Sequence, residues 1–286
     1  MENNKFETYD MNKKDSFGIV FLYKFWPGRI LLQLLIRPAN SKFIGRIMDA
    51  GFTRHYIPRF IKNHNIDLTD YKEAKYKSFN DFFIREVKEG TRPVSMEPND
   101  VVAPCDGKLT VYRINEDSIF EIKNSKYKLK QMLKDKQLAE DFLGGLCLIF
   151  RLMPNDYHRY CFIDDGEVVS RKKIRGVLHT VRPIALRKHR IYRRNAREYV
   201  VLDTENFGTI VQMEVGALFV GRIKNDLSKK VFKRGEEKGM FEFGGSTVVI
   251  LFKKDVVNIE DVIFENTELN IETIVKMGMV IGVKNS

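Results

Sequence analysis

The chain has 286 residues, 43% of them hydrophobic, so it can bury the core of one large domain or of a domain with an appendage. Its formal net charge of +11 predicts an anionic partner, either nucleic acid or an anionic membrane surface. No RNP motif, zinc finger or heptad zipper accompanies the charge. No nucleic-acid partner is therefore expected, and an anionic membrane is favoured.

Cysteine usage and the opening residues indicate the compartment. Cys105, Cys147 and Cys161 are far apart and have no CxxC spacing, which argues against a disulfide framework or a cysteine zinc site. The opening residues, MENNKFETYDMNKKD, carry both acidic and basic side chains, unlike a signal peptide. We expect a cytosolic location.

The most apolar region is residues 17–50. Basic residues, Pro27 and Gly28 interrupt it, so it lacks the roughly 20 continuous apolar residues that a spanning helix needs. Short helical segments remain, with basic residues at their borders and the single Trp26 among them. Such segments suit the plane of a membrane surface, but the pattern is also typical of helices buried in a globular core.

Residues 56–89 are predicted to be further helix, in which Phe79, Phe82 and Phe83 share one face and pack into the core. From residue 100 onward, β-branched and aromatic runs separated by Gly, Asp and Asn turns predict short strands, interrupted by one helix around residues 126–143. The predicted fold class is α+β.

Two regions are expected in this fold. Residues 1–95 form an N-terminal helical part that associates with a membrane surface. Residues 96–286 form a mainly antiparallel β catalytic domain.

Several common chemistries are excluded by spacing. The five histidines show no HxH or HExxH spacing, so no metal site is expected. No glycine-rich loop ends in GK[ST], and the stretch around Ser246 lacks the second glycine of a GxSxG nucleophile elbow.

Three places remain for chemistry. Asp106 lies in APCDG, His158 lies in MPNDYHRY, and Ser246 follows Gly244 and Gly245 in FEFGGSTVVILF. Taken singly, these are an ordinary turn aspartate, a structural histidine and a Gly-Gly turn. Taken together they supply an acid, a base and a hydroxyl, which can act as a serine activated by a histidine that an aspartate orients.

These motifs carry a family resemblance. The series APCDG, MPNDYHRY, LHTVRPIAL, EVGALFVGRI and FGGST, in this order and separation, resembles phosphatidylserine decarboxylase, in the branch whose reactive motif reads Gly-Gly-Ser-Thr. SFNDFFIREVKEGTRPV resembles that family's entry to its catalytic domain, so the similarity covers roughly residues 20–286.

The resemblance implies a self-made cofactor. Ser246 would attack the carbonyl of Gly245, and the chain would divide into a β chain of residues 1–245 and an α chain of residues 246–286, which form a heterodimer. Ser246 would become a pyruvoyl group, which forms a Schiff base with phosphatidylserine and releases CO2 and phosphatidylethanolamine.

The resemblance also implies roles for the neighbouring residues. His158 would protonate the product, Asp106 would assist the base of self-cleavage, and Thr247 could stabilise the oxyanion. The enzyme is expected to bind peripherally to the cytoplasmic face of the cell membrane. Whether it forms a homo-oligomer stays open.

Two residues depart from the family pattern. Cys161 stands where the family usually has a second histidine, the base that activates the serine. Either His158 takes over, or the Cys161 thiolate serves, or self-processing is slow or absent. The last case would make the chain a non-processing homologue that binds anionic lipid. Arg182, in LHTVRP, replaces an expected uncharged polar residue near a stretch that could face the lipid headgroup.

Overall fold

The computed structural model describes most of the chain, and the fold is α+β with mainly antiparallel strands, as the sequence predicts. The described residues are 6–10, 16–115, 117, 119–122, 125–186, 191–218, 222–226, 228, 230–244 and 246–285. Gly245 and the basic residues 187–190 lie outside the described residues.

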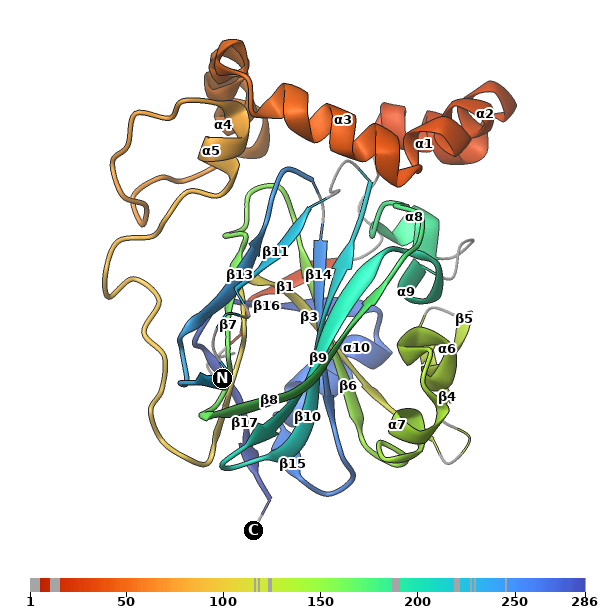
Figure 1. Cartoon of the computed structure of the whole chain (residues 1–286), viewed down its shortest axis with the longest axis vertical. Coiled ribbons are helices and arrows are strands. Elements are labelled where there is room, and N and C mark those ends of the chain that lie inside the picture. Colours follow the sequence, from red (N-terminus) through yellow and green to blue (C-terminus); the bar gives the residue numbers. More distant parts are fainter. Residues whose placement is uncertain are drawn as a thin grey trace.

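A nine-stranded antiparallel sheet forms the centre of the molecule (Figure 1). Its strand order is β1-β16-β3-β6-β14-β10-β9-β8-β12. The strands, in that order, are Thr8–Asp10, Ile271–Val275, Gly107–Arg113, Leu146–Leu152, Ser246–Phe252, Gly208–Gly216, Arg197–Thr204, Gly166–Ile174 and Val231–Phe232. β6 and β14 are buried along their whole length, which explains why apolar residues follow one another over residues 146–150 and 248–252 instead of alternating with polar ones.

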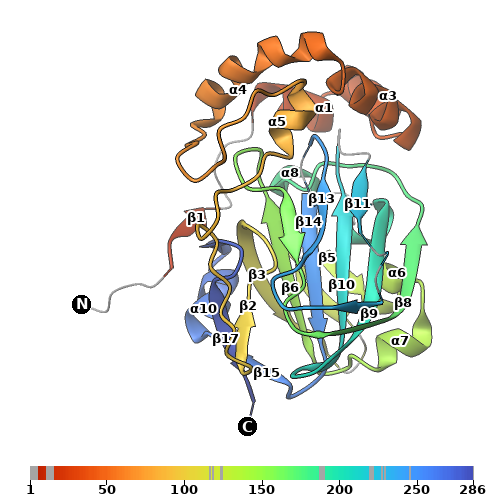
Figure 2. The same cartoon turned by 60° about the vertical axis from the view of Figure 1, so that its left-hand side comes forward.

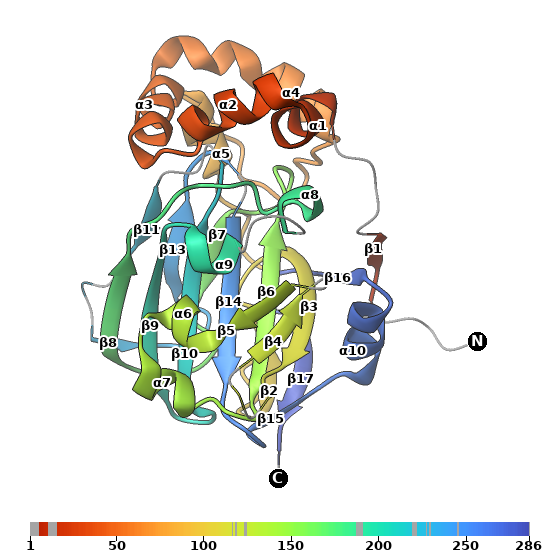
Figure 3. The same cartoon turned by 90° about the vertical axis from the view of Figure 1, so that its right-hand side faces the viewer.

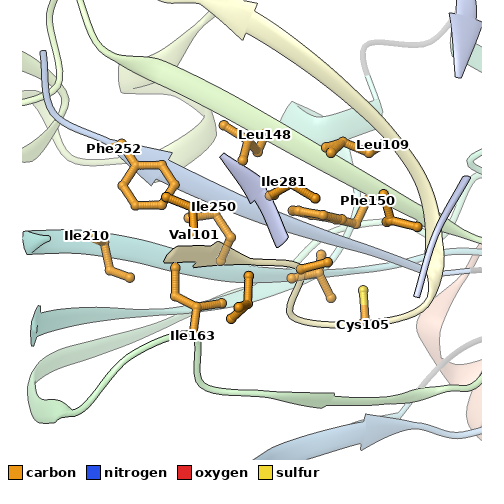
Figure 4. Close-up of a cluster of buried hydrophobic side chains, with 14 of the residues drawn as sticks. Val101, Cys105, Leu109, Leu148, Phe150, Ile163, Ile210, Ile250, Phe252 and Ile281 are labelled. Atoms are coloured by element: carbon orange, nitrogen blue, oxygen red, sulfur yellow. The ribbon is translucent and has the colours of Figure 1, made fainter. Parts of the chain in front are cut away.

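Smaller sheets cover one face of the central sheet. One has the order β11-β13-β7, and another has the order β15-β17-β2. Their strands, in those orders, are Ile223–Asn225, Glu237–Phe241, Arg159–Cys161, Val257–Ile259, Val280–Lys284 and Asp100–Val102. Leu148, Phe150 and Ile250 of the central sheet pack here against Val101 and Ile281 (Figure 4). This is the core between the two β layers.

Helices cover the opposite face (Figure 3). Ile149, Val249 and Leu251 belong to the core cluster on this face. The helices are α6 (Leu129–Leu133), α7 (Lys136–Glu140), α8 (Pro183–Leu186) and α9 (Ile191–Arg194). A two-stranded hairpin of β4 (Ile119–Ile122) and β5 (Ser125–Lys128) precedes α6, and α10 (Asp261–Glu268) packs beside β3.

An N-terminal helical layer lies across the end of the sheet at which β14 begins (Figures 1 and 2). It contains α1 (Phe17–Lys24), α2 (Trp26–Leu35), α3 (Pro38–Met48), the short helix η1 (Gly51–Tyr56), α4 (Ile57–His64) and α5 (Phe79–Phe83). Within the described part of the chain, no helix is long and apolar enough to cross a bilayer.

Three elements differ from the sequence prediction. The helix predicted around residues 126–143 is the strand β5 followed by two short helices, because Lys134 adopts a left-handed conformation (φ 48°) between them. The helix predicted over residues 56–89 is only α4 and α5. Thr8–Asp10 is a strand that pairs with β16. Without it, β16 would be the edge strand of the sheet and would have unpaired backbone N–H and C=O groups.

Candidate functional site

The Gly-Gly-Ser-Thr segment lies at the start of β14, in the middle of the central sheet. Ser246 pairs with Leu152 at the end of β6 and with Gly216 at the end of β10. Gly244, just before it, has a φ of 127°, a conformation that residues with a Cβ rarely adopt. The turn therefore requires glycine at this position, as expected from the sequence.

Ser246 is fully buried, and its Oγ has no hydrogen-bond partner among the described residues. Successive side chains of a strand point to opposite faces of its sheet. Val248 and Ile250 pack in the core between the β layers, so Ser246 points to that same face. Thr247 points to the helix-covered face, where Val249 lies, and its hydroxyl also lacks a partner in the part of the chain that is described. A buried hydroxyl without a hydrogen bond is costly, so Ser246 is a candidate for a reactive serine.

Helix α5 holds the segment before Ser246 in place. The Phe243 N–H donates to Asn80 Oδ1 (3.0 Å), and the Asn80 amide donates to Asp49 Oδ1 (2.9 Å). The rings of Phe79 and Phe83 contact Phe243 at centroid distances of 5.0 and 5.5 Å. The aromatic stripe predicted to be core packing is buried, and two of its rings pack against the turn that precedes Ser246.

Asp106 lies at the same end of the central sheet as Ser246, the end at which β3 and β14 begin. The registers place Lys108, Arg151 and Thr247 in one row across β3, β6 and β14. Because neighbouring strands are about 4.8 Å apart, the backbones of Asp106 and Ser246 are roughly 10 Å apart.

The carboxylate of Asp106 has defined partners. Arg92 donates to both of its oxygens at 2.9 Å, and the Met277 N–H donates to Oδ1 at 2.9 Å. The structure therefore shows Asp106 bound to an arginine, and no hydrogen bond joins it to His158 among the described residues.

His158 is a buried imidazole with a defined tautomer. Its Nδ1 lies 2.9 Å from the Asp156 carbonyl oxygen, which can only accept, so Nδ1 carries the proton. Nε2 therefore presents its lone pair, and it has no partner within the described residues. Burial, with the positive charges of Arg85 and Lys108, lowers the pKa of His158 to about 3. The ring is therefore neutral at physiological pH, and its Nε2 can accept a hydrogen bond.

Two contacts bring His158 close to the reactive turn. Its ring packs against Phe83 at 4.0 Å, and Phe83 in turn contacts Phe243. The His158 carbonyl accepts a hydrogen bond from the Phe241 N–H (2.9 Å), at the end of β13. The segment from Phe241 to Ser246 is short, so tertiary contacts bring these two candidate residues into one region.

Cys161 lies on β7, three residues further along. Its N–H donates to the Pro104 carbonyl (2.9 Å), which places it beside the turn that carries Asp106. Burial raises the pKa of the Cys161 thiol to about 12. At neutral pH the thiol is protonated, so it cannot serve as the serine base as a histidine would.

A cavity of about 200 Å³ opens next to Gly244, between the helical layer and the sheet. Ile19, Phe60 and Phe83 line it from the helices, and Leu152 and Val181 line it from the sheet side. Apolar walls with a few polar groups are typical of small-ligand sites. Phe243 and Gly244 of the turn before Ser246 line the cavity, so a ligand in it would contact that turn.

Sequence reasoning missed two residues that hold this site. Asn80 accepts a hydrogen bond from the Phe243 N–H, just before Ser246, and Arg92 donates hydrogen bonds to the carboxylate of Asp106. Both lie in SFNDFFIREVKEGTRPV, which the sequence marked as a motif but without a role for either residue. A hydrogen bond between side chains that are distant in sequence leaves no periodic pattern in the sequence, so it cannot be predicted from periodicity.

The comparisons with known proteins agree with these features. The family described as phosphatidylserine decarboxylase matches residues 79–283. Phosphatidylserine decarboxylase proenzyme 2 of Clostridium acetobutylicum is 48% identical over 281 residues, which are 98% of this chain and 96% of that protein. The phosphatidylserine decarboxylase proenzyme of Clostridium perfringens is 39% identical over 289 residues, 99% of this chain and 98% of that protein. The chain belongs to the phosphatidylserine decarboxylase family.

Proposed function

We propose that this chain is a proenzyme that cleaves itself between Gly245 and Ser246 and then decarboxylates phosphatidylserine to phosphatidylethanolamine and CO2. One observation carries the proposal. The hydroxyl of Ser246 is buried without a hydrogen bond, directly after a turn that needs glycine, in a chain of this family. The same serine has the carbon atoms from which a pyruvoyl group would be made, and its hydroxyl is the group that attacks Gly245, so the site fits that group.

The proposed cleavage begins when Ser246 Oγ attacks the carbonyl carbon of Gly245. A C–O bond forms, the C–N bond breaks, and the hydroxyl proton passes through a base to the nitrogen that leaves. Loss of the Cα proton of residue 246 then expels the Gly245 carboxylate and leaves dehydroalanine. One water converts dehydroalanine to the pyruvoyl group and ammonia.

We assign the proton transfers to His158. Its Nε2 lone pair is available at neutral pH, whereas the Cys161 thiol is protonated. The pyruvoyl group, once formed, supplies a ketone that holds the substrate amine and withdraws electrons from the carbon that loses CO2. His158 then relays a proton from solvent to this carbon, and its ring is neutral before and after the step. Asp106 acts through Arg92, by fixing the turn beside β7.

The two proposed pieces stay together because β14 is a central strand. It begins the α chain at Ser246 and pairs along its length with β6 and β10 of the β chain. Cleavage therefore leaves a heterodimer with the central sheet intact.

The purified chain is expected to separate into two pieces on a denaturing gel, because cleavage would precede isolation. The smaller piece, residues 246–286, contains 41 residues. Its mass is expected to be lower by one ammonia than that of the fragment made by simple hydrolysis, because the pyruvoyl group has lost the serine nitrogen. Mass spectrometry of the small piece checks this.

The alternative is a non-processing homologue that binds anionic lipid. The raised pKa of the Cys161 thiol favours it, because the usual base is missing. A single chain that stays intact after long incubation would select this alternative. If Cys161→His then restored cleavage, the missing base would be the cause.

We further propose that the helical layer binds the cytoplasmic face of an anionic membrane. Its exposed apolar side chains are Phe17, Phe25, Trp26, Ile30, Leu31, Leu34, Phe43 and Phe52. Its exposed basic side chains include Lys24, Arg29, Arg37, Lys42, Arg46, Arg54, Arg59 and Lys62. Apolar side chains flanked by cations suit an anionic lipid surface. The three free cysteines support the cytoplasmic side.

The double variant Trp26→Ser/Phe43→Ser is expected to bind vesicles that contain anionic lipid at least tenfold more weakly. Burial of each side chain contributes about 1.5–3 kcal/mol, and both are more than 60% exposed in the free protein. Vesicle sedimentation measures the binding. The matched control, Met96→Ser/Leu269→Ser, removes side chains of similar exposure outside the helical layer and is expected to bind normally. Equal binding by both double variants would contradict the proposed membrane face.

A further inference from the structure

The cavity beside Gly244 has polar groups as well as apolar walls. His64, at the end of α4, and Arg182, just before α8, both line it, together with Arg151. Glu272 accepts two hydrogen bonds from Arg151 in a buried ion pair, so the charge of Arg151 is compensated. None of the described residues that line the cavity is acidic. The cavity therefore offers a favourable environment for an anion.

His64 and Arg182 act on each other across the cavity. Burial, and then the positive charge of Arg182, lower the pKa of His64. The two side chains come from parts of the chain far apart in sequence, so the fold has brought a cation and a titratable donor together. An anion bound beside both would offset the charge of Arg182, favour the protonated form of His64 and accept hydrogen bonds from both side chains.

We propose that Arg182 and His64 bind the phosphate of the lipid substrate, a subsite that rests on the proposed function. In phosphatidylserine a short chain of covalent bonds separates the amino group from the phosphate. The amino group must reach residue 246, so the phosphate must lie a few ångströms away. Gly244, His64 and Arg182 all line the same cavity.

The size and walls of the cavity support a headgroup rather than a whole lipid. A volume of about 200 Å³ is smaller than the pockets that enclose drug-sized ligands, so the acyl chains stay outside. Ile19 and Phe60 line the cavity from helices of the proposed membrane-binding layer. A lipid in the bilayer can then extend its headgroup into the protein while its chains stay in the membrane.

The self-cleaved enzyme tests the role of Arg182 in substrate binding. Arg182→Gln is expected to cleave itself fully and to raise KM for phosphatidylserine in mixed micelles by about 10- to 100-fold, the effect of losing a charged hydrogen bond of about 1.5–3 kcal/mol. Its kcat is expected to change less than threefold, because the phosphate is remote from the reacting carbon. The KM of Arg182→Lys should lie between that of the wild-type enzyme and that of Arg182→Gln. Arg171→Gln, an exposed arginine on β8, is the matched control and should leave KM unchanged. An unchanged KM in Arg182→Gln would overturn the subsite.

Binding without turnover separates this inference from the proposed reaction. In Ser246→Ala, histidine NMR signals are followed over pH with short-chain phosphatidylserine or with inorganic phosphate, and His64→Asn assigns the signal of His64. An anion beside His64 favours the charged ring, so phosphatidylserine is expected to raise the pKa of His64 by about one unit or more.

Each outcome of the titration decides the inference. A shift with phosphatidylserine supports the headgroup subsite, whether or not inorganic phosphate also causes one. A shift with inorganic phosphate alone shows a site for free phosphate and overturns the assignment to substrate. No shift with either ligand overturns the subsite. Each of these three outcomes can be interpreted even if the wild-type chain proves not to decarboxylate lipid, because the experiment measures binding alone.

Discussion

Ser246→Ala is expected to give a single intact chain of 286 residues and to release no CO2 from phosphatidylserine above background. The alanine side chain has no oxygen to attack the carbonyl of Gly245, so neither the break nor the ketone can form. The denaturing gel and a radiolabelled CO2 assay measure the two losses. A 41-residue piece from this variant, or unchanged CO2 release, would show that another residue is the nucleophile.

Unfolding is not expected to explain that loss. The Ser246 hydroxyl is buried and has no hydrogen bond in the described part of the chain, so its removal relieves an unsatisfied polar group. The midpoint of thermal unfolding should stay equal to that of the uncleaved wild-type chain or rise. Ser246→Cys is the matched variant that keeps a nucleophile, and slow cleavage is expected of it.

His158→Ala is expected to slow self-cleavage by about 10²–10⁴-fold, the usual contribution of a positioned general base. The reason is that His158 Nε2 carries a lone pair beside the reactive turn, and it is unbonded among the residues described. Cys161→Ser, in contrast, should cleave at nearly the wild-type rate, because the thiol does not act as the base. The appearance of the small piece with time, in freshly translated chains, measures both rates. Slow cleavage in Cys161→Ser together with normal cleavage in His158→Ala would reverse the assignment.

The pH dependence of cleavage separates the same two bases. A base works in its deprotonated form, and His158, with a pKa of about 3, is deprotonated throughout the range from pH 5 to 9. Its contribution to the rate should therefore be flat over this range. The Cys161 thiol has a pKa of about 12, so roughly one part in 10⁵ is thiolate at pH 7. A rate that rises tenfold for each pH unit would identify the thiolate.

The order of motifs in the sequence was enough to predict the family. APCDG, MPNDYHRY and FGGST place an acid, a base and a hydroxyl in fixed order, and the family comparison supports their common origin. β-Branched and aromatic runs predicted the strands, because such runs and the turn residues between them are local signals. The need for glycine at position 244 was also local, since it follows from backbone geometry alone.

The helical segments were predicted less well, because tertiary packing decided them. The aromatic stripe of Phe79, Phe82 and Phe83 was correctly placed in the core, but its helix is only five residues long. Ser78 begins that helix by accepting a hydrogen bond from Asp81 N–H (3.1 Å). After it, the chain leaves the helix and pairs Val87 with Tyr71. Such pairings cannot be read from periodicity.

The sequence by itself determined the family, the α+β class, and the serine that follows two glycines, because these depend on residue order and local backbone preference. Only the tertiary structure decided that Arg92 donates hydrogen bonds to the Asp106 carboxylate and that His158 has its lone pair on Nε2. The same holds for the proximity of His64 to Arg182. The physical reason is that hydrogen bonds and charge interactions depend on distance in space. The sheet registers and the packing of the helical layer set those distances, and both join residues far apart along the chain.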